Sequence, residues 1–504
     1  MHSFQSTMSG KVEEGYKQIH TFEVKGMGLA YDAATGCLHK LDPVGRGVLD
    51  YCLEQGIDFQ HCCTAGEQVQ LKQVISSLSP AFSREEVKSA WEEIKLQAGK
   101  TLWGEDESLA GYPPGPGSGP GEAVALARED MPLPPVKAMC LNIAHDCNLV
   151  CRYCFAAQGR FGGKPVLMTP ETAKKAIDFL IGASGNRRYL DVDFFGGEPL
   201  LSFDTVRQAV LYARKEGTKH GKEFRFTLTT NCTLLNKEII DFLNDWNISV
   251  ILSLDGRPEV HDKMRPQRDG SPSHGQGIAN GLRLVESRGG RDYYVRGTYT
   301  RYNLDFYRDA RYLYEAGFKR MSLEPAIGAN ADWAIREEDL PYIAESYAEL
   351  TEFWEDCYKK NAPMDYYHFE LGLDRGVCRE RRITGCGAGY EYLAVTPEGT
   401  VYPCHQLVGQ DKYRLGSIFE SSSNALCEQV DILKRQNIPG KFYLSRVPNK
   451  QKCIKCWARY LCGGGCHAGA LASTGDIMNP DPLACRIMKI RLEFALYVQY
   501  IKSV

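Results

Sequence analysis

A short apolar stretch that runs directly into three closely spaced cysteines most constrains what this chain can fold into. The stretch extends from Leu141 to Phe155, and it carries Cys147, Cys151 and Cys154 in the spacing CxxxCxxC. Thiolates in tight spacings of this kind hold four-iron four-sulfur clusters. Three ligands would leave one iron of such a cluster open for another molecule. The pattern therefore predicts a buried strand followed by a cluster-binding loop.

A structural zinc site is the alternative for the same three thiols. Zinc spacings usually pair one C-x2-C unit with a second such unit or with two histidines. No partner of that kind lies close to Cys154 in the sequence. The spacing therefore favours an iron–sulfur cluster over zinc.

Cys147, Cys151 and Cys154, with Tyr153 before the last cysteine, resemble the signature of the radical S-adenosylmethionine (SAM) enzymes. The resemblance implies that the open iron binds SAM. An electron from the cluster then cleaves SAM to methionine and a 5′-deoxyadenosyl radical, which takes a hydrogen atom from a substrate. The cofactor supplies this chemistry, while the protein positions it and excludes water and oxygen. The resemblance makes the three cysteines catalytic as well as metal-binding.

Composition sets the broad class of the protein. A chain of 504 residues with 43% hydrophobic residues is long enough for roughly two to four domains. The net charge of −3 leaves no basic footprint, so we expect no nucleic acid or membrane partner. Residues 1–16 are polar and lack a secretory signal, and no apolar run approaches a membrane span. We therefore expect a cytoplasmic protein whose 19 cysteines are metal ligands or free thiols rather than disulfides.

Residues 19–100 have the pattern of a small separate module. Strands are expected at His20–Val24, Met27–Tyr31 and Cys37–Leu41, and helices at Val48–Glu54, Gln68–Leu78 and Arg84–Gln97. Ser83 followed by Glu86 is a capping box for the last helix. The order predicts a winged-helix-like domain without the basic helix of a DNA binder. It resembles the leader-peptide recognition domain of peptide-modifying enzymes, which captures a ligand by adding a strand to its sheet. A purely structural appendage is the alternative.

Residues 101–135 form the expected linker, because Pro and Gly alternate from Gly111 to Gly121 and can build neither helix nor sheet. Such a tether would let the N-terminal module hold one end of a peptide while the other end reaches a distant active site.

Strands and helices alternate over residues 136–345. Strands are expected at Val136–Ile143, Tyr189–Phe195, Phe224–Thr230, Ile248–Leu254, Tyr293–Tyr299 and Arg320–Glu324. The helices between them are expected at Pro170–Ile181, Phe203–Lys215, Lys237–Trp246, Gly277–Glu286 and Leu304–Ala316. This alternation predicts parallel strands with right-handed crossovers. We expect an α/β fold, a partial (β/α)6 TIM-like barrel with functional residues at the carboxyl ends of its strands.

The second expected strand ends in Phe195-Gly-Gly-Glu-Pro199, which resembles the GGEP motif that holds the SAM amine in this family. The candidate SAM contacts at strand ends and in the following loops are Tyr153, Gly196, Gly197, Glu198, Pro199, Thr230, Asn231, Ser253, Asp255, Arg265 and Arg296. For the residues at strand ends, simple capping is the alternative. Arg265 and Arg296 are candidates to pair with the SAM carboxylate or a peptide substrate, or to form structural ion pairs.

A second group of cysteines fills the last third of the chain. Cys453, Cys456, Cys462 and Cys466 have the spacing Cx2Cx5Cx3C, with Cys386 and Gly399-Thr-Val-Tyr-Pro-Cys404 before them and Cys485 after them. Four such thiols alone would also suit a zinc ribbon. The whole pattern resembles the SPASM domain of radical SAM maturases, which implies two auxiliary clusters and hence three four-iron four-sulfur clusters in all.

The resemblance assigns the SPASM cysteines to two sets. Cys453, Cys456, Cys462 and Cys485 would hold the distal cluster, and Cys386, Cys404 and Cys466 the proximal one. Cys378 is a candidate fourth ligand of the proximal cluster. The alternative is an open iron that binds a substrate thiolate. The expected domain order is completed by a bridging region over 346–385, the SPASM domain over 386–490 and a C-terminal helix over 491–504.

His405 follows Cys404 at a position where anaerobic sulfatase maturases have an Asp proposed as a base, and it is a candidate catalytic residue. The segments around Tyr390 and Tyr402 look closest to the maturases of six-cysteine (SCIFF-type) peptides. That resemblance implies an enzyme that joins a Cys sulfur to a carbon of another residue in a Cys-rich precursor peptide, with an external electron donor. The alternatives are a sulfatase-maturase-like enzyme that oxidises Ser or Cys, and a non-catalytic iron–sulfur protein.

Overall fold

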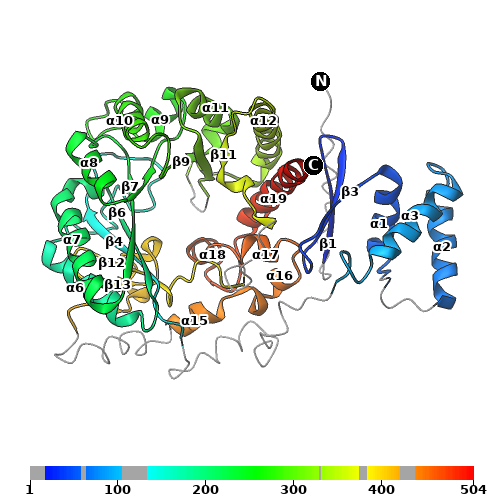
Figure 1. Ribbon diagram of the computed structural model, residues 1–504, viewed down its shortest axis with the longest axis horizontal. Helices are drawn as coiled ribbons and strands as arrows, with labels where there is room; N and C mark the ends of the chain where they lie inside the picture. The colour runs from blue at the N-terminus through cyan, green and yellow to red at the C-terminus, as the bar shows by residue number, and fades with distance from the viewer. Residues whose placement is uncertain are drawn as a thin grey trace.

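The computed structural model describes residues 18–57, 59, 64–104, 133–327, 331–373, 383–420 and 438–504. Most of the expected linker lies outside these residues, as does Cys378. The described chain forms two sheets, a three-stranded one near the N-terminus and a large curved one that carries most of the helices (Figure 1). No described helix combines the length and apolar character that crossing a membrane would require.

The N-terminal module contains three strands followed by three helices, in the predicted order. They are β1 (Ile19–Val24), β2 (Met27–Asp32), β3 (Leu38–Leu41), α1 (Pro43–Glu54), α2 (Thr64–Leu78) and α3 (Arg84–Gln97). The strands pair antiparallel in the order β1-β2-β3. The capping box between Ser83 and Glu86 is confirmed. Helix α1 begins earlier than predicted because the Asp42 side chain accepts a hydrogen bond from the Gly45 amide and caps it.

The large sheet is open, with the strand order β11-β10-β9-β8-β7-β6-β4-β12-β13-β14. Its members are β4 (Ala138–His145), β6 (Tyr189–Gly196), β7 (Glu223–Thr230), β8 (Ser249–Leu252), β9 (Tyr293–Tyr299), β10 (Arg320–Pro325), β11 (Asp365–Tyr366), β12 (Tyr392–Val395), β13 (Thr400–Tyr402) and β14 (Gly416–Ser417), with β5 (Val166–Leu167) paired to β4. The strands from β11 to β12 are parallel. The six predicted strands are confirmed, and the barrel is not closed. The pairing of β12 with β4 was not predicted.

Helices cover the outer face of the curve, and C-terminal helices lie across from its inner face (Figure 1). The helices of the barrel are α6 (Pro170–Ala183), α7 (Phe203–His220), α8 (Lys237–Asp245), α9 (Pro258–Met264), α10 (His274–Ser287), α11 (Phe306–Ala316) and α12 (Leu340–Lys359). The C-terminal helices are α15 (Ile438–Leu444), α16 (Gln451–Ile454), α17 (Arg459–Cys462), α18 (His467–Thr474) and α19 (Pro482–Ser503). Helix α12 runs through residue 345 and α19 runs through residue 490, where domain boundaries were expected.

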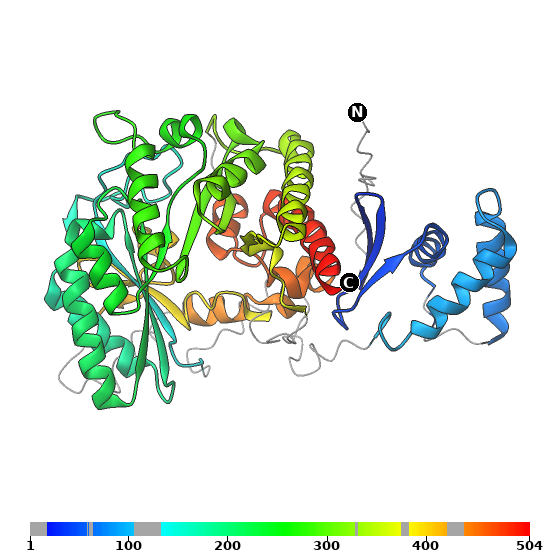
Figure 2. The same cartoon turned by 45° about the horizontal axis from the view of Figure 1, so that its top comes forward.

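The N-terminal sheet is buried on both faces. Phe22 and Tyr31 belong to the main core, whereas Ile19 belongs to a separate core shared with α1–α3. The His20 ring stacks on Trp457 with ring centroids 4.0 Å apart, and its Nε2 lies 2.9 Å from Glu493 Oε1 on α19. The sheet therefore lies between α19 and its own helices, which extend away from the barrel in both views (Figures 1 and 2).

Replacing His20 with alanine should loosen this docking. An aromatic stack contributes about 0.5–1.5 kcal/mol beyond area burial, so amide hydrogen exchange in residues 19–32 should accelerate about two- to tenfold. Exchange in β6–β8 should not change. The exposed His220→Ala is the matched control. Unchanged exchange in His20→Ala would mean that the stack does not hold the sheet.

Candidate cluster and cofactor site

The loop that carries the first three cysteines is held by backbone hydrogen bonds on one side. The amide of Val150 donates to the carbonyl of Pro266 at 2.9 Å, and the amide of Arg152 donates to the carbonyl of Met264 at 2.9 Å. An isolated bridge between Leu149 and Gln267 adds to this pairing. The loop is therefore attached to the segment after α9, which places its thiols at the carboxyl end of β4.

The three thiols of this loop lie close enough to influence one another. Burial raises the pKa of Cys147 to about 12, with the charges of Glu198, Cys151 and Cys154 adding to the effect. Burial also raises the pKa of Cys151 to about 11, although the Arg265 charge opposes it. The Leu149 amide donates to Cys147 Sγ at 3.4 Å. These thiols resist ionisation by themselves, but they share one loop with an amide that donates to sulfur. A bound metal group would keep such thiols deprotonated, so the loop suits one.

The residues therefore fit an iron–sulfur cluster at Cys147, Cys151 and Cys154. Within the described part of the chain, no group of three His, Cys, Asp or Glu side chains closes on a single point as ligands of one metal ion do.

Asp255 and Arg265 are paired with each other beside the loop. Arg265 Nε lies 3.0 Å from Asp255 Oδ2, and the Tyr153 hydroxyl donates to the same oxygen at 2.5 Å. The Thr298 amide donates to Asp255 Oδ1 at 2.9 Å. Arg265 also lies over the Tyr153 ring, 5.4 Å from its centroid. Both oxygens of Asp255 are thus engaged, as the structural ion-pair alternative anticipated for Arg265.

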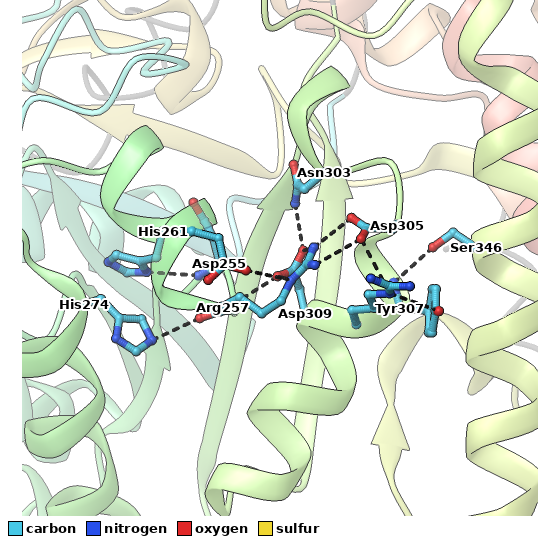
Figure 3. A network of polar contacts seen from close by, with 12 residues as sticks. Asp255, Arg257, His261, His274, Asn303, Asp305, Tyr307, Asp309 and Ser346 are labelled. Atoms are coloured by element: carbon cyan, nitrogen blue, oxygen red, sulfur yellow. Dashed lines mark hydrogen bonds and ion pairs between the residues drawn. The ribbon is translucent and has the colours of Figure 1, made fainter.

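The turn after β8 is fixed by a polar network that extends to α11 (Figure 3). The Asp255 amide donates to His261 Nδ1 at 3.3 Å, and Arg257 pairs with Asp305 at 2.7 Å and Asp309 at 2.8 Å. Gly256 has φ +120°, and an added Cβ would lie 2.3 Å from the Cβ of Asp309. Burial lowers the pKa of His261 to about 4, so this histidine is neutral at pH 7. The network therefore fixes the position of Asp255 through its backbone amide.

The Gly-Gly-Glu-Pro motif packs directly on the cysteine loop. The Gly197 amide donates to the Ala144 carbonyl at 2.7 Å, and the Glu198 amide donates to the Asp146 carbonyl at 2.9 Å. A Cβ on Gly197 would lie 2.1 Å from the Asp146 carbonyl oxygen, so only glycine fits there. Pro199 begins the short helix η1 (Pro199–Ser202).

Glu198 is fully buried, and its carboxylate connects the end of β6 to the end of β7. Its carboxylate accepts hydrogen bonds from the Thr230 hydroxyl at 2.9 Å and the Asn231 amide at 2.8 Å. Burial raises the pKa of Glu198 to about 7, against the effect of these donors. The Asn231 side chain lies 3.9 Å from Cys147 Sγ. The structure thus brings Glu198, Thr230 and Asn231 together around Cys147; their contacts with SAM remain a prediction.

Ser253 and Arg296 differ in their placement. The Ser253 amide donates to the Thr230 carbonyl at 2.8 Å, so Ser253 lies beside the residues around Glu198. Arg296 is exposed on β9. Among the residues that the structure describes, it makes no ion pair within 4 Å. After burial, its charge contributes to the lowered pKa of His405, so Arg296 lies near that residue.

Among the described cysteines of the last third, two groups lie close enough to influence one another's ionisation, and their assignment to two clusters stays a prediction. In one set, burial raises the pKa of Cys404 to about 12, and the charges of Cys466 and Cys386 add to it. In the other set, burial raises the pKa of Cys453 to about 12 and that of Cys485 to about 11, with contributions from Cys462 and Cys456. The Gly469 amide donates to Cys466 Sγ at 3.4 Å. Both sets fit iron–sulfur clusters.

Lys450 is a residue of this region that the sequence did not reveal. Its side chain is 1% exposed, and its ammonium group donates to the Gly464 carbonyl at 2.9 Å. Burial lowers the pKa of Lys450, while the charges of Cys453, Cys462 and Cys485 oppose that shift. A buried cation beside these three thiols would balance part of a cluster's negative charge. A lone Lys in a polar segment gives no sequence signal for this role.

His405 lies between the two parts of the site. The Tyr392 hydroxyl and His405 Nδ1 are 3.0 Å apart. The His405 ring is 5.6 Å from Phe155 of the cysteine loop and 5.0 Å from Phe195 of the GGEP strand, measured between centroids. Burial lowers the pKa of His405 to about 4. The residue after Cys404 thus faces the first cysteine loop.

A separate hollow of about 360 Å³ opens beside Cys147 and Arg268.

These features define a class: an open parallel α/β sheet whose first barrel strand ends in a three-thiol loop, joined to a cysteine-rich domain that continues the sheet. Residues 141–273 match the Radical SAM superfamily, and residues 386–457 match the SPASM iron-sulfur cluster-binding domain. The chain therefore carries a radical SAM domain followed by a SPASM domain, in the predicted order. These domains imply four-iron four-sulfur clusters and SAM.

Several known proteins resemble this chain over most of its length. The radical SAM cyclopropyl synthase TigE of Paramaledivibacter caminithermalis is 24% identical, covering 70% of this chain and 73% of TigE. The serine-type anaerobic sulfatase-maturating enzyme of Bacteroides thetaiotaomicron is 25% identical, covering 68% and 85%. Among solved structures, anSMEcpe with bound AdoMet has a TM-score of 0.60 at 21% identity, covering 73% of this chain and 99% of that one. Streptococcus suis SuiB bound to S-adenosylmethionine has a TM-score of 0.51 at 16% identity, covering 93% and 99%. These structural likenesses establish the fold.

Gly197→Ala should disrupt the site because its Cβ would meet backbone. Overpacking of this kind costs about 1–3 kcal/mol, so the unfolding midpoint of the iron-free protein should fall, and so should iron retained after anaerobic loading. Gly275→Ala is the matched control, since it has open space around its Cβ in α10 and Ala is the better helix former. Equal behaviour of the two variants would contradict the close packing of Gly197 on Asp146.

Lys450→Met should make the reduction potential of the distal cluster more negative, because it removes a positive charge beside the ligands without removing a ligand. An anaerobic redox titration followed by electron paramagnetic resonance measures the shift. Lys452→Met, on the exposed side of the same segment, should leave the potential unchanged. A potential unaffected by loss of Lys450 would show that its charge does not act on the cluster.

Proposed function

We propose that this enzyme installs thioether crosslinks, joining a Cys sulfur to a carbon of another residue in a ribosomally made, cysteine-rich precursor peptide. The observation that carries the proposal is the approach of the two thiol regions. His405, next to Cys404, contacts both Phe155 of the first cysteine loop and Phe195 before the GGEP motif. A peptide between them would have a hydrogen-abstracting group on one side and a thiol-binding group on the other.

The roles of the residues follow from this arrangement. Cys147, Cys151 and Cys154 would hold the first cluster. When this cluster and SAM are bound, they would supply an organic radical that can remove a hydrogen atom from carbon. Glu198, Thr230, Asn231 and Ser253 would orient SAM at the strand ends. The seven SPASM cysteines would hold two auxiliary clusters, for three in total. Cys386, Cys404 and Cys466 give the proximal one three thiols, so either Cys378 or a substrate thiolate would complete it.

The N-terminal module would capture the leader of the precursor. Strand β1 lies beside α19, whereas β3 pairs only with β2 within the described residues. The outer edge of β3 would therefore accept a strand from a peptide, as sheet-edge recognition requires. A peptide substrate is also supported by the solved anSMEcpe structure with AdoMet and the Cp18Cys peptide.

Oxidation of a Ser or Cys in a protein substrate is the second candidate. It is favoured by the similarity to sulfatase-maturating enzymes, of which this chain covers 85% in the Bacteroides thetaiotaomicron example. The two functions differ in what happens to the peptide's thiols. A crosslink consumes one free thiol per event and keeps the sulfur, whereas oxidation of Cys to an aldehyde releases it.

The deciding experiment incubates the reconstituted enzyme anaerobically with SAM, a reductant and a synthetic cysteine-rich precursor peptide. We expect 5′-deoxyadenosine and a product two hydrogen atoms lighter per crosslink, with one fewer free thiol. A product that keeps all its thiols or loses sulfur would overturn thioether formation. Failure to form 5′-deoxyadenosine would indicate a non-catalytic iron–sulfur protein.

A further inference from the structure

Asp193 lies on the inner face of the curved sheet. Along β6, Leu190, Val192 and Phe194 are buried in the core beneath the outer helices. Side chains alternate along a strand, so Asp193 and Phe195 point to the opposite face. That face is the one toward the C-terminal domain (Figure 1), and Phe195 there contacts His405.

The neighbours of Asp193 follow from the strand register. Asp193 stands opposite Cys140 on β4 and opposite Thr227 on β7. The Thr227 hydroxyl is buried without a hydrogen-bond partner. Asp193 itself makes no hydrogen bond or ion pair to any residue that the structure describes. By contrast, Asp191 on the same face pairs with Arg225 at 2.7 Å. Asp193 is therefore an uncommitted carboxylate beside an uncommitted hydroxyl.

The C-terminal domain reaches the same place. The pKa of Tyr392 is raised well above its usual range, by burial first and then by the charges of Cys140, Asp193 and Cys404. The Asp193 charge also raises the pKa of Cys140, after burial, and Cys404 adds to that effect. Cys140, Asp193, Tyr392 and Cys404 therefore form one neighbourhood. It joins the inner face of β6 to the cysteine set expected to hold the proximal cluster.

The groups around Asp193 explain its ionisation. Burial, followed by the charge of Asp191, raises the pKa of Asp193 to about 6. The other titratable groups shown beside it are Cys140 on β4 and Tyr392 on β12, while Arg225 on β7 is paired with Asp191. A carboxylate with such a pKa is ionised at pH 7 and is a stronger base than an ordinary Asp. It therefore has the protonation state and basicity that a proton acceptor needs.

We propose that Asp193 is a catalytic base that takes the proton from the cysteine thiol of the substrate as this thiol approaches Cys404. The S–H bond breaks, its electron pair stays on sulfur, and the proton moves to a carboxylate oxygen of Asp193. No oxidant or reductant takes part in this step. The proposal rests on the proposed function in that it needs a thiol substrate. By resemblance, sulfatase maturases would carry such a carboxylate at the position of His405. In this chain the proposed carboxylate lies on β6 instead.

The test compares Asp193→Asn with Asp191→Asn in the reconstituted full-length enzyme, using the synthetic precursor peptide. Asp193→Asn keeps the shape and should fold, because it replaces a carboxylate that pairs with nothing described. General base catalysis contributes about a hundredfold or more, so modified peptide formed per 5′-deoxyadenosine should fall by about that factor. Formation of 5′-deoxyadenosine should stay within twofold of the wild type, and Asp191→Asn should resemble the wild type in both respects. Equal yields from the Asp193→Asn and wild-type enzymes would overturn the proposal, as would a parallel loss of 5′-deoxyadenosine.

A second measurement judges Asp193 without the peptide or its chemistry. N-acetylcysteine N-methylamide is titrated into each reconstituted protein, and the protons released to solvent are counted by calorimetry in buffers of different ionisation enthalpy. A thiolate bound beside Asp193 is a like charge that raises the pKa of the carboxyl further, so the carboxyl holds part of the thiol proton. Wild type and Asp191→Asn should therefore release fewer protons per thiol bound than Asp193→Asn, which should release about one. Equal release by all three proteins would overturn the proposal. If the wild type oxidises the precursor without crosslinking it, thioether formation fails, and the proton count still decides the role of Asp193.

Discussion

The buried carboxylate of Glu198 is the contact on which the cofactor end of the sheet depends. It accepts hydrogen bonds from the end of β7 while its own amide donates to Asp146 in the cysteine loop. One residue thus connects the ends of three strands, β4, β6 and β7. An acid in that position costs desolvation energy, which its three donors offset only in part. This arrangement fixes the position of the first cysteine loop relative to the ends of β6 and β7.

A second constraint relates the two cysteine regions to each other. Strand β12 pairs in parallel with β4, placing Ala394 opposite Cys140 and Val395 opposite Leu141. The strand that leads into the first cysteine loop is therefore the neighbour of a strand of the SPASM domain. Because hydrogen-bonded register permits no small shifts, the set around Cys404 is held at a defined distance from the first cysteine loop. Electron and proton transfer both require such a fixed separation.

Local patterns in the sequence were sufficient for much of this structure. Alternating strands and helices, the capping box at Ser83 and the two cysteine spacings all depend on residues close together in the chain. Contacts between distant segments were beyond such reasoning. The pairing of β12 with β4, the commitment of Arg265 to Asp255 and the burial of Lys450 each join residues whose partners no spacing indicates. Asp193 illustrates the difference, since in the sequence it is one polar position of an ordinary alternating strand, and only the register gives it neighbours.

The N-terminal module is attached through the same segments that carry the distal cysteines. Its His20 stacks on Trp457, which directly follows Cys456, and approaches Glu493 on α19, the helix that contains Cys485. Lys25 adds an ion pair to Glu355 on α12, against which α19 packs. The sheet is therefore anchored to two elements that a cluster at these cysteines would hold together. A metal group at these cysteines would stabilise the segments against which the N-terminal sheet packs. Its effect on stability would therefore extend beyond its own ligands.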